Sequence, residues 1–360
     1  EMGDRVRALN DLDHAIRLKP DAQLYADRAA ELFAQAQYDQ AIADCDRALD
    51  LDPARAPLIG LRARCHADRG DSEAALKDFE HALAADPASA PRYRLWRAQL
   101  HFDLENHAAA TDDVTQVIAA EPNLVDAYHL RAAIRQQAND FAGAVEDLTA
   151  ALAHKPGDPF AHLGRAIGRL LLRDHTGAAA DADEVLKKMP GMLKAYEIRG
   201  NARRALADLD GALADFNEAV KLAPNAPMPY NYRAGVHYAQ KRYGAAVRDH
   251  MEALKRDPRS SSTFNQLGWL WATCPDPDVR NGDRARECAT RACELTEWSE
   301  PGFLDTLAAA CAECGEFEDA IKWQEKAIDL LDDEARRADY RTRLVLYEAG
   351  RPARVPGGEG

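Results

Sequence analysis

A proline that returns at nearly constant spacing constrains the fold of this chain more than any other feature. Successive intervals between these prolines are 33, 34, 35, 34, 34, 34 and 34 residues. Each interval holds two Ala-rich segments with helical periodicity, and proline ends a helix because it cannot donate to the helical ladder. A self-similar array is therefore predicted, in which each unit packs against its neighbours and the product is a long surface. The recurring residues are Pro20, Pro53, Pro87, Pro122, Pro156, Pro190, Pro224 and Pro258.

Small residues recur at fixed positions within the period. When the proline is counted as position 32, repeat one begins at Ala22 and repeat seven at Pro227. Position 8 is alanine or glycine in all seven repeats, and position 20 is always alanine, so two helices of one repeat can approach closely. Position 8 holds Ala29, Ala63, Ala98, Ala132, Ala166, Gly200 and Ala234; position 20 holds Ala41, Ala75, Ala110, Ala144, Ala178, Ala212 and Ala246.

This pattern resembles the tetratricopeptide repeat (TPR) family over nearly the whole chain. The resemblance implies an all-α fold: a right-handed superhelical α-solenoid of about nine helix-turn-helix repeats plus a C-terminal capping helix. We expect a second helix of a truncated repeat at 1–20, seven regular repeats at 21–260, two divergent repeats with a long Pro-containing loop at 261–332, the capping helix at 333–352 and a flexible tail at 353–360. The start within a repeat suggests that the native protein extends upstream.

Composition narrows the class of partner. The net charge is −14, from 46 basic and 60 acidic residues, which argues against nucleic acid because phosphate binding needs a basic stripe. No run of 18 apolar residues is present, so no membrane span is predicted. Seven cysteines without a regular framework spacing fit a reducing compartment. We therefore expect a cytoplasmic protein.

Arginine and aspartate recur as a pair, which departs from the leucine that the family usually has at position 7. Both change together after Pro258, to Leu267 with Cys288 and to Leu307 with Trp323. Charges lost as a pair suggest charges used as a pair, so we predict an Arg–Asp bridge within each repeat. Position 7 holds Arg28, Arg62, Arg97, Arg131, Arg165, Arg199 and Arg233; position 23 holds Asp44, Asp78, Asp113, Asp147, Asp181, Asp215 and Asp249.

Two interpretations of this Arg–Asp ladder remain open. Semi-buried bridges would tie the first helix of each repeat to the second, and breaking one partner would cost about 3–5 kcal/mol. Solvated pairs would contribute only about 0–1 kcal/mol each. In either case the ladder is structural and not catalytic.

The C-terminal part has a different composition, with four of the five tryptophans after Pro258. The strings Thr273-Cys274-Pro275-Asp276 and Leu304-Asp305-Thr306-Leu307 followed by three alanines resemble a recurrent C-terminal ending of bacterial TPR proteins. That resemblance implies a bacterial origin and an end-cap role, and it implies no reaction. A solenoid also needs an atypical terminal unit to close its core.

Residues that could carry chemistry fit packing positions better. Cys311 and Cys314 form a C-x-x-C, but they lie inside a predicted helix and lack a second pair with zinc spacing. His66, His101 and His237 share position 11, a packing site. No phosphate loop, nucleophile elbow or metal-binding string is present. We predict no catalytic residue, no cofactor and no metal site, so the chain is not expected to be an enzyme.

The resemblance places the binding surface on the concave side, at first-helix positions 2, 5, 9, 12 and 13. Repeat five then presents an apolar patch, and three residues of repeats six and seven flank it. The alternatives are that internal packing or self-association buries the patch. The clamp by which chaperone-binding TPR domains hold a terminal carboxylate is absent, since only Asn201 matches it. The predicted patch is Phe160, Leu163, Ile167, Leu170 and Leu171, with Lys194, Arg204 and Tyr238 beside it.

Two functions follow from the sequence. One is a protein-interaction scaffold whose groove holds a peptide or helix of a partner. The other is the substrate-recruiting arm of a larger enzyme whose catalytic domain lies upstream of Glu1. A catalytic motif in the upstream reading frame would favour the second.

Overall fold

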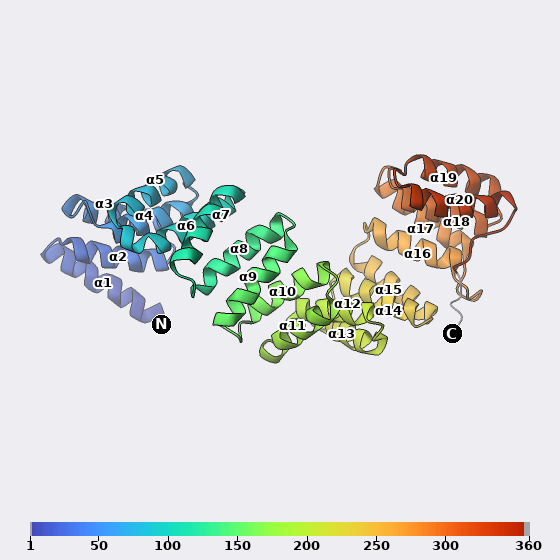
Figure 1. Cartoon of the computed structure of the whole chain (residues 1–360), viewed down its shortest axis with the longest axis horizontal. Helices are drawn as coiled ribbons and strands as arrows, with labels where there is room; N and C mark the ends of the chain where they lie inside the picture. The colour runs from blue at the N-terminus through green and yellow to red at the C-terminus, as the bar shows by residue number, and fades with distance from the viewer. Residues whose placement is uncertain (1, 356–360) are drawn as a thin grey trace. The chain divides into compact units, whose positions relative to one another are not determined.

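The computed structural model describes residues 2–355 and, for side chains, residues 7–355 (Figure 1). Within that range the chain forms 20 α-helices, one 3-10 turn and no strand, so the predicted all-α fold is confirmed. The chain divides into two compact units, one ending at Leu172 and one beginning at Arg173. No described helix is both long and apolar enough to cross a membrane.

The first unit consists of a leading helix, four helix pairs and the first helix of repeat five. Each helix packs on the next one in the chain. The helices are α1 (Met2–Leu18), α2 (Ala22–Ala34), α3 (Tyr38–Leu51), α4 (Ala56–Arg69), α5 (Ser72–Ala85), η1 (Pro87–Ser89), α6 (Ala90–Asp103), α7 (His107–Ala120), α8 (Val125–Gln137), α9 (Phe141–His154) and α10 (Pro159–Leu171).

The second unit begins with the second helix of repeat five and ends with a helix that follows repeat nine. Its helices are α11 (His175–Lys188), α12 (Leu193–Ala205), α13 (Leu209–Leu222), α14 (Pro227–Ala239), α15 (Tyr243–Arg256), α16 (Ser261–Thr273), α17 (Gly282–Leu295), α18 (Pro301–Glu313), α19 (Phe317–Asp329) and α20 (Glu334–Glu348).

The turn between two helices of a repeat is built from local signals. In repeat four, Asn139 adopts a left-handed conformation with φ 59°, and Asp140 caps α9 by accepting a hydrogen bond from the backbone N–H of Gly143 at 2.9 Å. An acidic N-cap satisfies a helical N–H that has no partner within the helix. The helix then ends at His154, two residues before Pro156, because proline cannot continue the ladder.

The small residues at positions 8 and 20 fill the seam between the paired helices. Ala29, Ala41, Ala98 and Ala110 are all completely buried. Glycine replaces alanine in repeat six, where a Cβ on Gly200 would lie 2.8 Å from the ring of Phe216. Close helix approach in this seam therefore depends on side-chain size at a single position.

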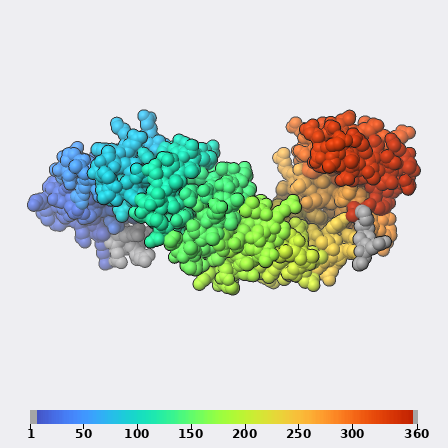
Figure 2. All heavy atoms as spheres, in the orientation of Figure 1, coloured from blue at the N-terminus to red at the C-terminus, as the bar shows by residue number. Residues whose placement is uncertain are grey.

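The last helices of the second unit, at the orange and red end of the colour bar in Figure 2, contribute to one buried core. Two sets of contacts hold the longer loop after α16 in place. Arg280 donates to the carbonyl oxygens of Cys274 and Pro275 and forms an ion pair with Glu313 of α18 at 3.1 Å. The backbone N–H of Val355 donates to the carbonyl of Thr273 at 3.1 Å, so the segment after α20 returns to the end of α16.

Candidate functional site

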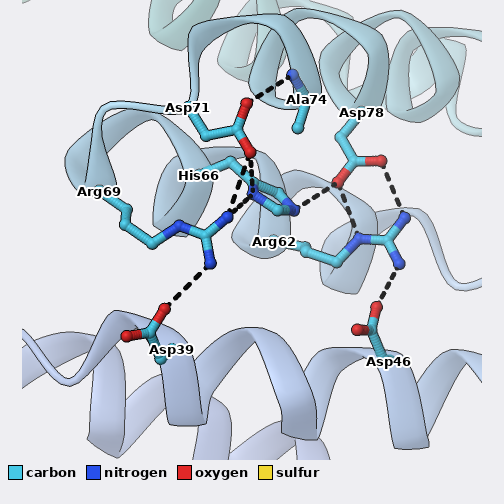
Figure 3. Close-up of polar contacts among 8 residues, drawn as sticks. All are labelled: Asp39, Asp46, Arg62, His66, Arg69, Asp71, Ala74 and Asp78. Carbon is cyan, nitrogen blue, oxygen red and sulfur yellow. Dashed lines mark hydrogen bonds and ion pairs between the residues drawn. The ribbon is translucent and has the colours of Figure 1, made fainter.

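Arginine at position 7 lies between two second helices, and Arg62 shows the arrangement (Figure 3). Its Nε and Nη2 donate to the two carboxylate oxygens of Asp78 on α5, at 2.7 and 2.8 Å. Its Nη1 donates to Asp46 on α3 at 2.5 Å. A two-point bond between planar groups fixes both side chains in orientation.

The same within-repeat bridge occurs in six repeats of the described chain, with a shortest N–O distance of 2.6 or 2.7 Å in each. The arginine side chains are 17–23% exposed and the aspartates 2–10% exposed, so these pairs are semi-buried. The pairs are Arg28–Asp44, Arg62–Asp78, Arg97–Asp113, Arg131–Asp147, Arg199–Asp215 and Arg233–Asp249. Arg165 belongs to the first unit and Asp181 to the second, so their pairing stays a prediction.

A contact to the preceding repeat was not predicted from the sequence. It joins position 7 to position 25 of the repeat before, and it varies in chemistry. Arg199 bonds Asp183 at 2.5 Å, whereas Arg233 bonds the amide oxygen of Asn217 at 2.9 Å. Arg165 donates to the hydroxyl of Thr149 at 3.1 Å. The ladder therefore connects neighbouring repeats as well as the two helices of one repeat.

Position 11 supplies a second basic group to the same aspartates. Arg135 donates to Asp147 and Arg203 to Asp215, each at 2.9 Å. The ring of His237 lies 3.6 Å from Asp249. Burial lowers the pKa of this histidine, against the opposing effect of the aspartate, so the ring is neutral near pH 7 and packs beside the ladder.

In repeats eight and nine the ladder positions are apolar. Leu267, Cys288 and Leu307 are buried in the shared core, and Trp323 is partly buried against it. A different charged contact appears here: Nε of Arg343 on α20 lies 2.7 Å from Asp305 on α18. Asp305 is 5% exposed, and Gln324 also donates to it, at 2.8 Å. This buried cluster, which sequence reasoning missed, holds α20 against repeat nine.

The cysteines lie at packing positions. Six of the seven are buried, Cys314 is intermediate, and none forms a disulfide in the structure. Burial raises the pKa of Cys311 and Cys293 to about 12 and that of Cys288 to about 11. These thiols are therefore protonated near neutral pH and poor nucleophiles.

The apolar part of the predicted patch lies entirely on α10. Phe160 and Leu171 are 60% and 54% exposed, while Leu163, Ile167 and Leu170 are half-buried. The three flanking residues lie in the second unit, so the structure describes the two parts of the patch separately. The helix α10 therefore presents two exposed apolar side chains near its ends and half-buried ones between them.

In the second unit, a groove of about 480 Å³ brings together two of the flanking residues, Arg204 and Tyr238. Lys194 does not line it and pairs with Glu197 at 3.2 Å. The groove runs across the first helices of repeats six, seven and eight. Besides those two residues, its lining is Met228, Asn231, Tyr232, Gly235, His250, Ser262, Gln266, Trp269 and Leu270.

A second hollow of about 500 Å³ adjoins this groove and shares Tyr238 and Trp269 with it. Its other wall comes from α20 and the segment after it, including Arg343 and Arg354. Both of these arginines are already paired with carboxylates, Arg343 with Asp305 and Arg354 with Glu313. The two aromatic side chains therefore stand between two hollows, in a position to contact a ligand in either.

Electrostatics distinguish the groove from the rest of the chain. None of the described residues that line it is Asp or Glu, although the chain carries 60 of them. Arg204 is exposed, and among the described residues its guanidinium donates only to the amide oxygen of Asn201, at 3.2 Å. A Cβ on Gly235 would lie 2.7 Å from Nη1 of Arg204. Glycine at this position thus lets the guanidinium lie against α14.

The floor of the groove carries a buried imidazole. His250, which is 6% exposed, occupies position 24, where other repeats have side chains such as Cys45 and Phe216. Its Nδ1 lies 2.9 Å from Oδ1 of Asn231, whose Nδ2 donates to the hydroxyl of Thr263 at 2.8 Å. Cys45 and Phe216 are fully buried at this position, so the repeat pattern predicts a packing residue here and does not indicate a polar network.

Models of the tetratricopeptide repeat match residues 32–100, 130–192 and 199–261, which together make up more than half of the chain. No curated protein matches the sequence.

Solved structures give the same fold at low identity. A tetratricopeptide repeat protein from Parabacteroides merdae is 14% identical, with a TM-score of 0.51 over 81% of this chain and 98% of that one. The C-terminal part of a TPR repeat-containing protein from Cytophaga hutchinsonii is 15% identical, with a TM-score of 0.57 over 66% and 98%. Pseudomonas aeruginosa pilF is 16% identical, with a TM-score of 0.50 over 56% and 92%. At these identities the likeness concerns the fold alone. From the repeat models and the paired helices, the chain belongs to the tetratricopeptide repeat family.

Proposed function

We propose that this chain is a protein-interaction scaffold that holds a peptide or helix of a partner in the groove across α12, α14 and α16. The observation that carries the proposal is the groove lining, in which Tyr232, Tyr238 and Trp269 stand beside an unpaired cation and exposed polar side chains. Aromatic residues with a few placed polar groups are typical of recognition surfaces, because rings bury much area at low entropic cost.

The apolar face of α10 is proposed as a separate contact surface. Phe160 and Leu171 are large apolar side chains that remain exposed, and exposed apolar patches commonly mark protein contacts. The partner that covers this face is either a helix of another protein or a second copy of this chain, and the experiment must distinguish the two.

Site-specific photocrosslinking tests both surfaces. p-Benzoylphenylalanine is placed at Gln266 in the groove, at Leu171 on α10 and, as a control, at the exposed Arg259 outside both. Crosslinks to one protein from Gln266 and not from Arg259 support the groove. Crosslinks from Leu171 to that protein, or to this chain itself, assign the α10 face. Equal labelling from all three positions contradicts both proposals.

A further inference from the structure

The groove of the second unit carries a specific chemistry for its occupant, beyond the general statement that it binds a partner. We propose that it holds an extended peptide segment in which an internal Asp or Glu pairs with Arg204 and a nearby aromatic side chain packs against Tyr238 and Trp269. This inference rests on the proposed function, since it names the partner chemistry of the same groove.

The charges of the groove favour an acidic ligand. The groove combines one unpaired guanidinium with a lining that has no described carboxylate. Among the neighbouring cations, Lys194, Arg343 and Arg354 each form an ion pair with a residue of this chain. Arg204 is therefore the lining residue placed to receive an anion from outside. A guanidinium fork matches a carboxylate in shape as well as charge.

The first unit shows that this charge pattern is not general to the chain. The corresponding hollow near repeats two and three, of about 260 Å³, is lined by Asp68 and Asp103. There the arginine already contacts aromatic side chains of this chain: the guanidinium of Arg64 lies 4.4 Å from the ring centre of Phe33 and 4.8 Å from that of Trp96. Only the second-unit groove, among the hollows described above, offers an arginine that is neither sandwiched nor paired with a carboxylate.

The buried imidazole supplies a third contact. With Oδ1 of Asn231 as the acceptor, Nδ1 of His250 carries the hydrogen, and Nε2 of the neutral ring is an acceptor. Nε2 has no hydrogen-bond partner among the described residues, and His250, which is 6% exposed, lines the groove. A backbone N–H of the bound segment donates to Nε2, which fixes an extended backbone between the carboxylate and the aromatic side chain.

Peptide selection on the immobilised full chain is the direct test. A phage library of random dodecapeptides is selected against the wild type and against Arg204→Glu, Trp269→Ala and the matched control Arg259→Glu, an exposed arginine outside the groove. Wild type and Arg259→Glu are expected to enrich Asp or Glu close to Trp, Tyr or Phe. Arg204→Glu should lose the acidic enrichment and weaken binding of the wild-type-selected peptide by about tenfold or more, because like charges then oppose each other.

A second variant tests the imidazole without damage to the fold. Phenylalanine is buried at the same position of repeat two, as Phe79, in one cluster with Ala63 at position 8, and repeat seven also has alanine there, so His250→Phe keeps a side chain that this kind of seam accepts. Its melting temperature should stay near the wild-type value, while the selected peptide binds roughly three- to tenfold more weakly through loss of one hydrogen bond.

The outcomes distinguish the acidic-peptide inference from the more general groove proposal. Selected peptides that need Trp269 but show no acidic enrichment, or that bind Arg204→Glu as tightly as wild type, overturn the acidic-peptide inference and leave the groove proposal standing. Peptides that bind equally to Trp269→Ala overturn both.

Discussion

Arg62 donates through Nη1 to Asp46, a residue of the preceding repeat, while the rest of its guanidinium holds Asp78 of its own repeat. One side chain thus contacts two second helices. The hydrogen bond with Asp78 is the largest influence raising the pKa of Arg62, as expected for a charge-assisted pair. The consequence for stability can be measured where a pair has fewer additional partners.

Among the described residues, no second arginine donates to Asp113 and Arg97 forms no hydrogen bond to the preceding repeat. The Arg97–Asp113 bridge is therefore the rung of the ladder with the fewest additional partners. We expect Asp113→Cys to lower the free energy of unfolding by about 3 kcal/mol, near the low end for a buried pair since Arg97 keeps 21% exposure. The double variant Arg97→Leu/Asp113→Cys copies Leu267 and Cys288 of repeat eight and should stay within about 1 kcal/mol of wild type. Urea denaturation of a double-mutant cycle measures the coupling. A coupling energy near zero would show that the pair behaves as solvated charges.

The Arg343–Asp305 pair should hold α20 in place. Removing the cation with Arg343→Met leaves a carboxylate that is 5% exposed and whose pKa burial already raises. We expect a loss of about 3–5 kcal/mol, with faster hydrogen exchange in α20. Arg341→Met is the control on the same helix, because Arg341 and its partner Glu334 are 54% and 68% exposed, and it should cost less than about 1 kcal/mol. Unchanged exchange in α20 of Arg343→Met would rule out this role.

His250 should make stability depend on pH. Burial lowers its pKa to about 4, with Asp249 acting in the opposite direction. The unfolded state takes up a proton below its ordinary pKa of about 6.5, while the folded state does not until about pH 4. The stability that the neutral, buried imidazole of His250 allows is therefore fully present above pH 6.5, and it is lost as the pH falls towards 4. Between pH 7 and pH 4, wild type should lose up to about 3 kcal/mol more than His250→Phe. Parallel curves for the two proteins would contradict this assignment.

Thiol accessibility distinguishes the cysteines. Six are buried and Cys314 is intermediate, so Cys314 should react first with a disulfide reagent at pH 8 and the others only on unfolding. Cys314→Ser should remove the fast phase. Rapid reaction of Cys311 in the native protein would be inconsistent with its burial and its raised pKa.

The paired helices could be predicted from sequence because their signals are local and repeated. Proline spacing, alanine at position 20 and acidic N-caps such as Asp140 each act within one repeat. The joint loss of arginine and aspartate after Pro258 also indicated which residues work together. Repetition turned weak single signals into a consistent pattern.

The cross-repeat bond and the groove could not be predicted in this way. Position 25 holds Asp46, Thr149 and Asn217 in repeats one, four and six, so no single residue type marks this position along the chain. The second hollow depends on Val355 returning to Thr273, a contact between residues far apart in the chain. His250 occupies a repeat position that other repeats fill with packing side chains, and no residue near it in the sequence indicated that Asn231 would complete a polar network.

The arginine that spans two second helices also affects how a solenoid comes apart. A terminal repeat that frays takes with it the acceptor that its neighbour's arginine used, as Asp46 would for Arg62. The neighbour then keeps its own aspartate but loses the second contact of its arginine, so opening one repeat weakens the next wherever this contact exists. A different kind of seam follows where Leu267 replaces arginine. The change of residue at that seam marks a boundary in mechanical behaviour that the helix count alone does not reveal.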